Sequence, residues 1–336
     1  MNSTAERSYI YSKACGIIGK SFVGPRIRRL QDITRLSDLD RLLFPNSYED
    51  LPERELLIRL EKRIIARTTD QISLLLKTQQ SIPHFIGLLV RSYEYADVKL
   101  LVSALMDKRD LPPSHADLGR FTTVHFDKYP DPKALFTGTD FEWLIDNIPD
   151  NQSANMQIQA ELDRRYYTQL WNELCNISDP NIRFIKEIIA DEIELKNILW
   201  ALRLNYYYHF DKTSIEPLLL DLYDRKRSLV KAALECIDNP VDQYSAWASF
   251  KYISLLNPEE AGTFWRINIP HIQRKAALLL YKKTRAYFHR SPFSLNTTAC
   301  FIRLKQFEEE LLISLAEGIS LGLSGRDVLS MLEVLQ

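Results

Sequence analysis

A run of charged residues beside an apolar stripe is the first place in this sequence where chemistry could occur. Residues 191–204, DEIELKNILWALRL, carry Asp191, Glu192, Glu194 and Lys196 close together. The apolar residues of the segment recur at the i, i+3, i+4, i+7 spacing of one buried helical face. Carboxylates beside an apolar surface can have the shifted pKa values of a catalytic site. They can equally mark the start of a helix, whose positive end each acid stabilises by about 0.3–1 kcal/mol.

A second candidate is the sequence HFDK, which occurs at residues 125–128 and again at 209–212. A His and an Asp at such positions could contribute to a metal site of a phosphohydrolase. The two copies lie at different offsets from the helical segments compared below, and the remaining His and Asp ligands are not evident. We therefore interpret the repetition as coincidence, with a helical metalloenzyme as the alternative that a metal analysis would test.

Other catalytic and ligand-binding motifs are missing from the sequence. It contains no HExxH, GxSxG, GxxxxGK[ST] or DDxxD, so no zincin, nucleophile-elbow, Walker-type or terpene-synthase site is expected. The four cysteines are far apart and form no CxxC pair: Cys15, Cys175, Cys236 and Cys300. Their spacing argues against a zinc site and a disulfide scaffold. The sequence thus predicts a protein that is not an enzyme and takes no cofactor, metal or small-molecule substrate.

Composition and charge favour a soluble helical protein. The 336 residues carry 43 basic and 44 acidic side chains, a net charge of −1, which gives no field for nucleic-acid binding. Glycine is scarce at 10 residues, against a usual share of roughly 7%, so a β-rich chain with many tight turns is not expected. The N-terminus lacks the apolar core of a signal peptide. No apolar run approaches the ~18 residues of a membrane span.

Helical periodicity dominates the chain. Residues 49–77 predict a long helix that starts after Pro52, with one apolar and one charged face. Only 121–126, FTTVHF, resembles a strand, and one strand makes no sheet. Prolines mark the breaks between helical segments. We expect an all-α protein with ten or more helices joined by short connections.

One helical segment is repeated. Residues 93–105, YEYADVKLLVSAL, can be laid over DEIELKNILWAL with the apolar stripes in register. The matching pairs are Glu94 with Asp191, Asp97 with Glu194, Lys99 with Lys196, and Ala104 with Ala201. In each copy a proline, Pro83 or Pro180, stands 11 residues before the acidic start. A catalytic site would seldom be copied with equal spacing, so we interpret the repeated pattern as architecture.

A third, looser copy lies at 305–323, with Pro292 before it. Its matching positions would be Lys305, Glu308 and Gly318, although Glu309 could replace Glu308 after a one-residue shift. Three copies about 100 residues apart predict three related helical units. We place them at residues 1–115, 116–225 and 226–336, with the N-terminal helices able to pack against the third unit.

The basic stretch 273–290, QRKAALLLYKKTRAYFHR, is the leading candidate for a partner-docking surface. Its cations surround an apolar segment: Arg274, Lys275, Lys282, Lys283, Arg285 and Arg290. Such a stretch can simply be a solvated helix face. The alternative is docking on acidic loops or lipid headgroups of a partner. The tyrosines at 206–208, with Tyr223, could stack a ligand but more often belong to a core or an interface.

Three patterns stand in a fixed order along the chain. The opening pattern Y-x-Y-x-[RK]-[AV] fits Tyr9, Tyr11, Lys13 and Ala14. The pattern D-x-x-N-[IL]-K-x-L-L-R-A is echoed by Asp191, Leu195, Lys196, Leu199 and Ala201. The pattern K-E-x-E-x-x-N-L-R-x-I-x-x-G-K-x-x-G-L is matched by Lys305, Glu308, Leu312, Leu315, Gly318, Gly322 and Leu323. In these features the chain resembles the C-type subunits of the archaeal and bacterial V/A-type rotary ATPases, which are equivalent to the d-type subunits of the eukaryotic vacuolar pump.

The resemblance implies an all-helical funnel of three domains with pseudo-threefold symmetry. Such a protein links the membrane ring of proteolipid subunits to the central axle and transmits torque, without bond chemistry of its own, for ATP-coupled proton or sodium transport. It would lie on the cytoplasmic face of the membrane, held there only through the complex. Departures such as Ile313 and Ile319, where the family has Arg and Lys, remove charges that could touch partners. The alternative is a helical scaffold unrelated to rotary ATPases, whose repeats should be shorter, at periods of 20–50 residues.

Overall fold

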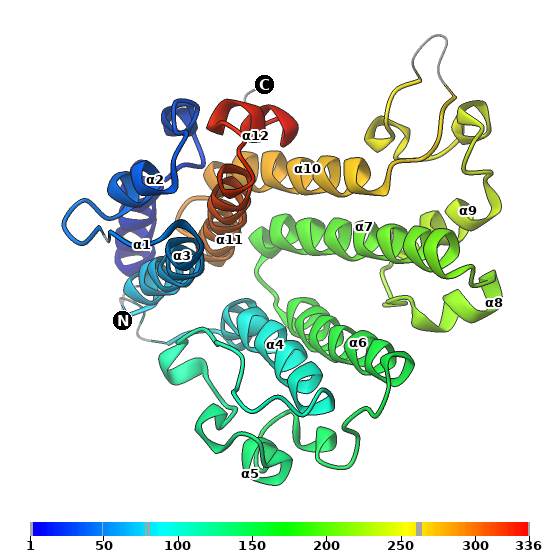
Figure 1. The fold of residues 1–336 in the computed structure, drawn as a ribbon, viewed down its shortest axis with the longest axis horizontal. Coiled ribbons are helices and arrows are strands. Elements are labelled where there is room, and N and C mark those ends of the chain that lie inside the picture. Colours follow the sequence, from blue (N-terminus) through cyan, green and yellow to red (C-terminus); the bar gives the residue numbers. More distant parts are fainter. Residues whose placement is uncertain (1–2, 49, 78, 80, 260–263, 335–336) are drawn as a thin grey trace. The chain divides into compact units, whose positions relative to one another are not determined.

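The computed structural model describes residues 3–48, 50–77, 79, 81–259 and 264–334. Helices and turns account for the regular structure of these residues, and no strand occurs among them. The prediction of an all-α protein is therefore confirmed (Figure 1). The α-helices are α1 Ser3–Ile18, α2 Leu36–Leu43, α3 Glu53–Leu76, α4 His84–Met106, α5 Pro132–Phe136, α6 Gln152–Asn176, α7 Arg183–Tyr208, α8 Lys212–Ile215, α9 Lys231–Asp238, α10 Ile269–Arg290, α11 Leu295–Ser320 and α12 Gly325–Met331.

Prolines set the starts of several helices, because proline has no N–H to donate and disfavours helical geometry in the residue before it. Pro52 is the N-cap residue of α3, as predicted, and Pro83 is the N-cap residue of α4. Pro180 opens the short 3₁₀ helix η5 (Pro180–Ile182), which leads directly into α7. The strand-like segment 121–126 instead lies between two 3₁₀ turns, η2 (Gly119–Phe121) and η3 (Phe126–Lys128).

The chain divides into two compact units. Unit 1 comprises residues 1–166 and 287–336, and unit 2 comprises residues 167–286. Helices α6 and α10 each contribute one part to unit 1 and the other part to unit 2. This division reflects which residues contact one another, whereas the predicted boundaries near residues 115 and 225 separate segments whose sequences resemble one another. The three-unit organisation therefore stays a prediction.

Helix α11 is the centre of unit 1. It packs against α3 and also contacts α1, α2, α4 and α12, so that residues from the two ends of the chain share one core. Leu60, Ile64, Leu312 and Leu315 are almost completely buried in this core. Burying such a side chain stabilises the fold by roughly 1.5–3 kcal/mol, so α11 is fixed by the N-terminal helices around it.

Two glycines allow α12 to approach its neighbours closely. A Cβ atom on Gly318 of α11 would lie 2.4 Å from Cγ2 of Val328 in α12. A Cβ atom on Gly325, at the start of α12, would lie 2.0 Å from the carbonyl oxygen of Leu30. The Gly325 N–H also donates to the carbonyl oxygen of Ile33 at 2.7 Å. Residues without a side chain are therefore required where α12 meets the rest of unit 1.

Helix α7 is the centre of unit 2. It packs against α9 and contacts α8 and η5, and residues around much of its circumference are buried, including Ile185, Ile189, Ile193 and Ile198. Most of unit 2 outside α7 and α10 consists of short helices and irregular segments. These segments must be fixed on α7 by contacts other than helix packing alone.

None of the described helices combines the length and hydropathy required to cross a bilayer.

Candidate functional site: buried carboxylates on three helices

The acidic residues of the opening segment lie in the middle of a helix. Helix α7 begins at Arg183, so Asp191 and Glu194 are more than two turns from its N-terminus. The interpretation of these acids as a helix start is therefore wrong, because the helix-dipole effect is limited to the first turn. The predicted apolar stripe is present, with Leu195, Ile198 and Leu202 buried. However, Asp191 and Glu194 are also buried, with exposed fractions of 6% and 2%.

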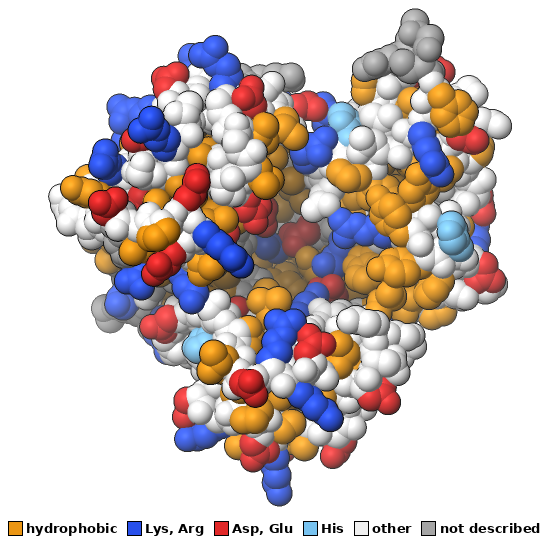
Figure 2. Space-filling model, viewed as in Figure 1, with side chains coloured by type: hydrophobic (Ala, Val, Ile, Leu, Met, Phe, Trp, Pro, Cys, Tyr) orange, Lys and Arg blue, Asp and Glu red, His pale blue; other side chains and the backbone are white. Residues whose placement is uncertain are grey.

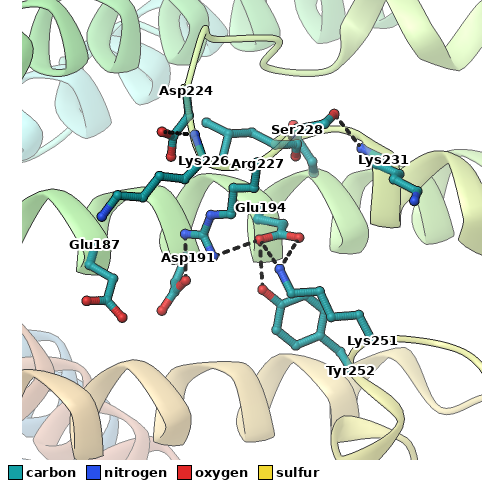
Figure 3. Close-up of polar contacts among 12 residues, drawn as sticks. Glu187, Asp191, Glu194, Asp224, Lys226, Arg227, Ser228, Lys231, Lys251 and Tyr252 are labelled. Atoms are coloured by element: carbon teal, nitrogen blue, oxygen red, sulfur yellow. Dashed lines mark hydrogen bonds and ion pairs between the residues drawn. The ribbon is translucent and has the colours of Figure 1, made fainter.

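Cations from two segments that follow α7 neutralise these buried acids (Figure 3). Arg227 lies between them, with Nη2 2.6 Å from Oδ1 of Asp191 and Nη1 3.2 Å from Oε2 of Glu194. Lys251 Nζ donates to both carboxylate oxygens of Glu194, at 2.6 and 2.7 Å, and the Tyr252 hydroxyl donates at 2.9 Å. A buried carboxylate without such donors would be strongly destabilising.

Helix α10 reaches the same acids from another direction. Lys283 donates to Asp191 and lies 2.6 Å from Oε1 of Glu187. Burial lowers the pKa of Lys283, but the hydrogen bonds and charges of Asp191 and Glu187 outweigh it and leave the pKa above its ordinary value. Burial likewise lowers the pKa of Arg227, but the charges of Asp191 and Glu194 outweigh this effect and raise the pKa above its ordinary value. Both cations therefore stay charged at all physiological pH values.

The side-chain amide of Asn197, one turn after Glu194 on α7, binds the backbone of the loop that carries Arg227. The buried Asn197 side chain donates to the carbonyl oxygens of Leu220 and Leu229, at 3.0 and 2.9 Å. Its Oδ1 accepts from the Leu220 N–H at 2.8 Å. These contacts satisfy backbone groups of a segment that has no helix or sheet partner. Together Asp191, Glu194 and Asn197 hold the loop 219–230, the segment at 251–252 and α10 on one helix.

Helix α4 carries a similar arrangement in unit 1. Glu94, with an exposed fraction of 1%, accepts hydrogen bonds from the N–H groups of Thr123 and Val124 and from the Thr123 hydroxyl. Arg91 is one turn before Glu94 on the same helix. Its Nε lies 2.8 Å from Oε2 of Glu94, and its Nη1 lies 2.5 Å from Oδ2 of Asp140. Glu94 thus attaches the irregular segment after α4 to the middle of that helix.

Asp97 adds a second attachment on α4. Its Oδ2 accepts from the Ala116 N–H at 2.8 Å. Burial raises the pKa of Asp97 to about 7, against the opposing effect of this hydrogen bond. The contacts on α4 and α7 therefore also fit a second alignment of the two helices, in which Glu94 matches Glu194 and Asp97 matches Asn197. This alignment is shifted by three residues from the predicted one.

Helix α11 is the third helix with a buried carboxylate of this kind. Glu308, with an exposed fraction of 1%, accepts from the Phe22 N–H at 2.7 Å and pairs with Lys305, one turn before it. Burial lowers the pKa of Lys305, and the charge and hydrogen bond of Glu308 oppose that effect. Here the attached segment follows α1 in the sequence. Lys305 also donates to the Ser21 hydroxyl at 3.3 Å.

The contacts of α11 favour Glu308 over Glu309 in the predicted equivalence. Glu308 attaches a backbone segment, as Glu94 does, and has its cation at the same i−3 position. Glu309 instead accepts from the Tyr93 hydroxyl at 3.0 Å, joining α11 to α4. With Glu308 in register, the small buried residues Ala104, Ala201 and Gly318 each stand ten positions after their acid.

The remaining predicted repeat residues contact α6. Lys99 Nζ lies 2.6 Å from Oδ1 of Asp163, within unit 1. Lys196 Nζ lies 5.5 Å from the centre of the Tyr167 ring, within unit 2. The two lysines thus attach α4 and α7 to different parts of the same helix, through an ion pair in one case and a cation–π contact in the other.

Comparison with known proteins identifies the family of the chain. The family model for the ATP synthase (C/AC39) subunit matches residues 24–330 of the chain. The chain belongs to this family. The C/AC39 proteins are non-catalytic accessory subunits of V/A-type ATPases, which confirms both the resemblance drawn from the sequence and the prediction that the chain is not an enzyme. The chain is also 26% identical over 318 residues to an uncharacterized protein of Treponema pallidum (strain Nichols), covering 94% of this chain and 92% of that protein.

For a C/AC39 protein, the buried carboxylates act as attachment points. The most deeply buried of these carboxylates are paired with cations of the protein itself, Glu94 with Arg91, Glu194 with Lys251 and Glu308 with Lys305. Among the described residues, no three His, Cys, Asp or Glu side chains are grouped to hold a metal ion. Of the two HFDK histidines, His125 precedes η3, and His209 ends α7 in a left-handed conformation with φ of 56°.

The structure places five of the six cations of the predicted docking stretch in different surroundings. Lys282 and Arg285 are exposed on α10, whereas Arg274 and Lys275 are partly buried. Lys283, with a side-chain exposure of 20%, is bound to Glu187 and Asp191 inside unit 2. Its charge is already neutralised there, so of the adjacent pair only Lys282 presents its ammonium group to a partner.

Several partners of the buried carboxylates could not be predicted from the sequence. Arg227, Lys251, Tyr252 and Thr123 meet the acids across 29 to 58 positions of chain. No periodic pattern connects residues so far apart. The one available signal was the DRKRS sequence at 224–228, a basic loop beside a buried acidic helix in this C/AC39 protein.

Proposed function

We propose that this chain is a central-rotor component of a V/A-type rotary ATPase that links the membrane ring of proteolipid subunits to the central axle. The match of the C/AC39 family to residues 24–330 carries the proposal. In this role the protein transmits torque for ATP-coupled proton or sodium transport and performs no bond chemistry. It lies on the cytoplasmic face of the membrane and is held there through the complex. Three related helical domains form a funnel with pseudo-threefold symmetry.

The attachment sites support a mechanical role. A torque adaptor must keep its shape under load, and irregular segments are the parts of a fold that open most easily. In both units such segments are joined to the middle of long helices by buried ion pairs and backbone hydrogen bonds. Breaking one contact leaves a buried charge without a partner, so the segments resist displacement more than a solvated loop would.

The exposed cations of α10 support contact with partners. Lys282 and Arg285 are one helical turn apart and exposed, and the whole of α10 contains no acidic residue. Partly buried Arg274 and Lys275 extend this basic character toward the start of the helix. Acidic loops of a neighbouring protein in the complex would complement such a face.

Purification from native membranes tests the proposal. The chain is tagged, the membranes are solubilised gently, and co-purifying proteins are quantified by mass spectrometry. We expect proteolipid and axle subunits of the ATPase, with one copy of the tagged chain per complex. Recovery of the chain without any ATPase subunit would contradict the proposal and leave the family likeness as a likeness of fold.

A further inference from the structure

An exposed aromatic surface lies at the C-terminal end of α7 in unit 2. Tyr207 has an exposed fraction of 55% and Phe264 of 78%. The Tyr206 and Tyr207 rings meet edge to face with centres 5.0 Å apart, and the Arg266 guanidinium lies 4.8 Å from the centre of the Tyr206 ring. Figure 2 shows hydrophobic surface where Figure 1 places the C-terminal half of α7. We call Tyr206, Tyr207, Phe264 and Arg266 the α7-end surface.

The segment that carries Phe264 and Arg266 is fixed by contacts of the buried Trp265 and of Asn257. Between them, Trp265 is buried at 6% exposure, stacks edge to face on Tyr244, and donates from Nε1 to the carbonyl oxygen of Asn257 at 3.0 Å. The Asn257 side chain in turn donates to the Arg266 carbonyl oxygen at 3.0 Å. Phe264 and Arg266 therefore point outward because Trp265 points inward, and the surface needs little ordering when a partner binds.

Arg266 is exposed, and its guanidinium lies over the Tyr206 ring. Among the described residues, no carboxylate lies within ion-pair distance of Arg266, in contrast to Arg227 of the same unit. A guanidinium on an aromatic face, two residues from an exposed Phe, has the composition of an interface hot spot, since Tyr and Arg are enriched there. Its complement is a carboxylate with apolar side chains on either side.

We propose that the α7-end surface docks a segment of another protein of the same rotary ATPase, one in which a carboxylate lies among apolar side chains. The inference rests on the proposed function and adds a place of contact and the chemistry of the partner. A lipid surface fits less well, since docking on anionic lipids typically uses clusters of 4–8 cations, and this surface has one arginine. The carboxylate pairs with Arg266 while apolar side chains cover Tyr207 and Phe264.

Charge reversal in the native complex provides the first test. Arg266→Glu is compared with Arg41→Glu, because Arg41 is also exposed and also lies over a tyrosine, 5.0 Å from the Tyr48 ring centre in unit 1. With tagged chains purified from membranes, we expect Arg266→Glu to recover roughly tenfold fewer ATPase subunits per chain, as for loss of one hot spot. Arg41→Glu should match the wild type. Equal recovery with all three proteins, or an equal loss in both variants, would overturn the proposal.

A photo-crosslinking residue identifies the partner directly. p-Benzoylphenylalanine replaces Phe264 or, as a control, Leu111 of unit 1, which has the same exposed fraction of 78%. We expect an adduct with another protein of the ATPase from position 264 and not from 111, in a peptide that contains Asp or Glu. Changing that acid to Lys should restore recovery with Arg266→Glu. Adducts with lipid or with a second copy of this chain would overturn the proposal.

The two proposals fail in different ways. If the wild-type chain recovers no ATPase subunit, the proposed function is wrong and this contact is wrong with it. If the wild type recovers the complex and both position-264 crosslinking and Arg266→Glu have no effect, only the docking surface is wrong. Circular dichroism of each variant excludes misfolding, which is not expected because Phe264 and Arg266 are exposed.

Discussion

Arg227 Nη2 lies 2.6 Å from Oδ1 of Asp191, and this ion pair joins a loop without regular structure to the middle of α7. Both residues are largely removed from water, with side-chain exposures of 25% and 9%. Each charge therefore needs the other as its partner, because water does not solvate it well. The same guanidinium also reaches Glu194, so removal of Arg227 leaves two buried acids short of a cation.

We expect Arg227→Met to lower the free energy of unfolding by about 3–5 kcal/mol, the usual cost of breaking a buried ion pair from one side. Arg225→Met is the matched control, since Arg225 is exposed two positions earlier and should change stability by less than about 0.5 kcal/mol. Urea unfolding followed by circular dichroism measures both. Partial recovery of stability when Asp191→Asn is added to Arg227→Met would identify the ion pair as the cause, and equal effects of Arg227→Met and Arg225→Met would contradict it.

Glu94 should control the segment that follows α4. We expect Glu94→Ala to cost about 3–5 kcal/mol, because Arg91 loses its buried partner and the Thr123 and Val124 N–H groups lose their acceptor. Glu94→Gln keeps one acceptor oxygen and should cost less. Limited proteolysis should then cut within residues 107–131 faster in Glu94→Ala than in the wild type. Glu142→Ala, at an exposed position of the same connection, should leave the cleavage rate unchanged.

Glu309 predicts a pH dependence of stability. Burial raises its pKa to about 8 from an ordinary 4.5, although hydrogen bonds from Tyr93 and Thr68 oppose the rise. The folded protein therefore keeps a proton that the unfolded chain releases, and stability falls as pH rises from about 4.5 to 8, by at most about 1.4 kcal/mol per pH unit. Glu309→Gln should flatten this dependence and exceed the wild type in stability above about pH 8.

Chemical denaturation of wild type and Glu309→Gln between pH 5 and 9 measures the difference. Glu317→Gln serves as the control, because Glu317 is exposed on the same helix. Parallel stability curves for Glu309→Gln and the wild type would show that Glu309 does not titrate in this range.

Gly325 should tolerate no side chain. In Gly325→Ala the new Cβ would lie 2.0 Å from the Leu30 carbonyl oxygen and 3.0 Å from that of Ile33. Both are backbone atoms, so α12 must move away, at a cost we expect to exceed about 2 kcal/mol. Gly16→Ala is the contrasting variant, since nothing lies within 4 Å of its new Cβ in α1, and it should be neutral or stabilising by up to about 1 kcal/mol. Thermal unfolding that ranks the two variants in the opposite order would contradict the packing described for α12.

Lys282 and Lys283 should respond differently to charge reversal. Lys283→Glu places a carboxylate beside Asp191 and Glu187 and should destabilise the protein by several kcal/mol. Lys282→Glu alters an exposed position and should change stability by less than about 0.5 kcal/mol, while reducing recovery of ATPase subunits from membranes. Unfolding curves separate the first effect from the second. Unchanged recovery with Lys282→Glu would count against docking through α10.

Local patterns in the sequence predicted much of the fold. The start of α3 after Pro52 and the buried stripe of α7 follow from proline stereochemistry and from the 3.6-residue period, which are properties of neighbouring residues. The role of the acids was missed for the same reason. Charge and spacing place Asp191 and Glu194 on α7, but local sequence does not show that the helix begins at Arg183 or that Arg227 and Lys251 return to it.

The candidate docking residues show where local reasoning ends. Six cations on one basic stretch look alike in the sequence, and the periodicity of α10 does not say which of its faces meets α7. The structure turns Lys283 inward and Lys282 outward, since residues one position apart on a helix point about 100° away from each other. Likewise, the buried Trp265 decides that Phe264 and Arg266 face outward.

The sequence by itself determined the helical class, the start of α3 after Pro52 and the resemblance to a rotary-ATPase family, because each depends on residues near one another or on ordered motifs. Tertiary structure alone decided which acids are buried and which cations neutralise them. Those choices depend on contacts across tens of residues, where the cost of burying a charge is balanced by a partner that only the folded chain brings within 3 Å.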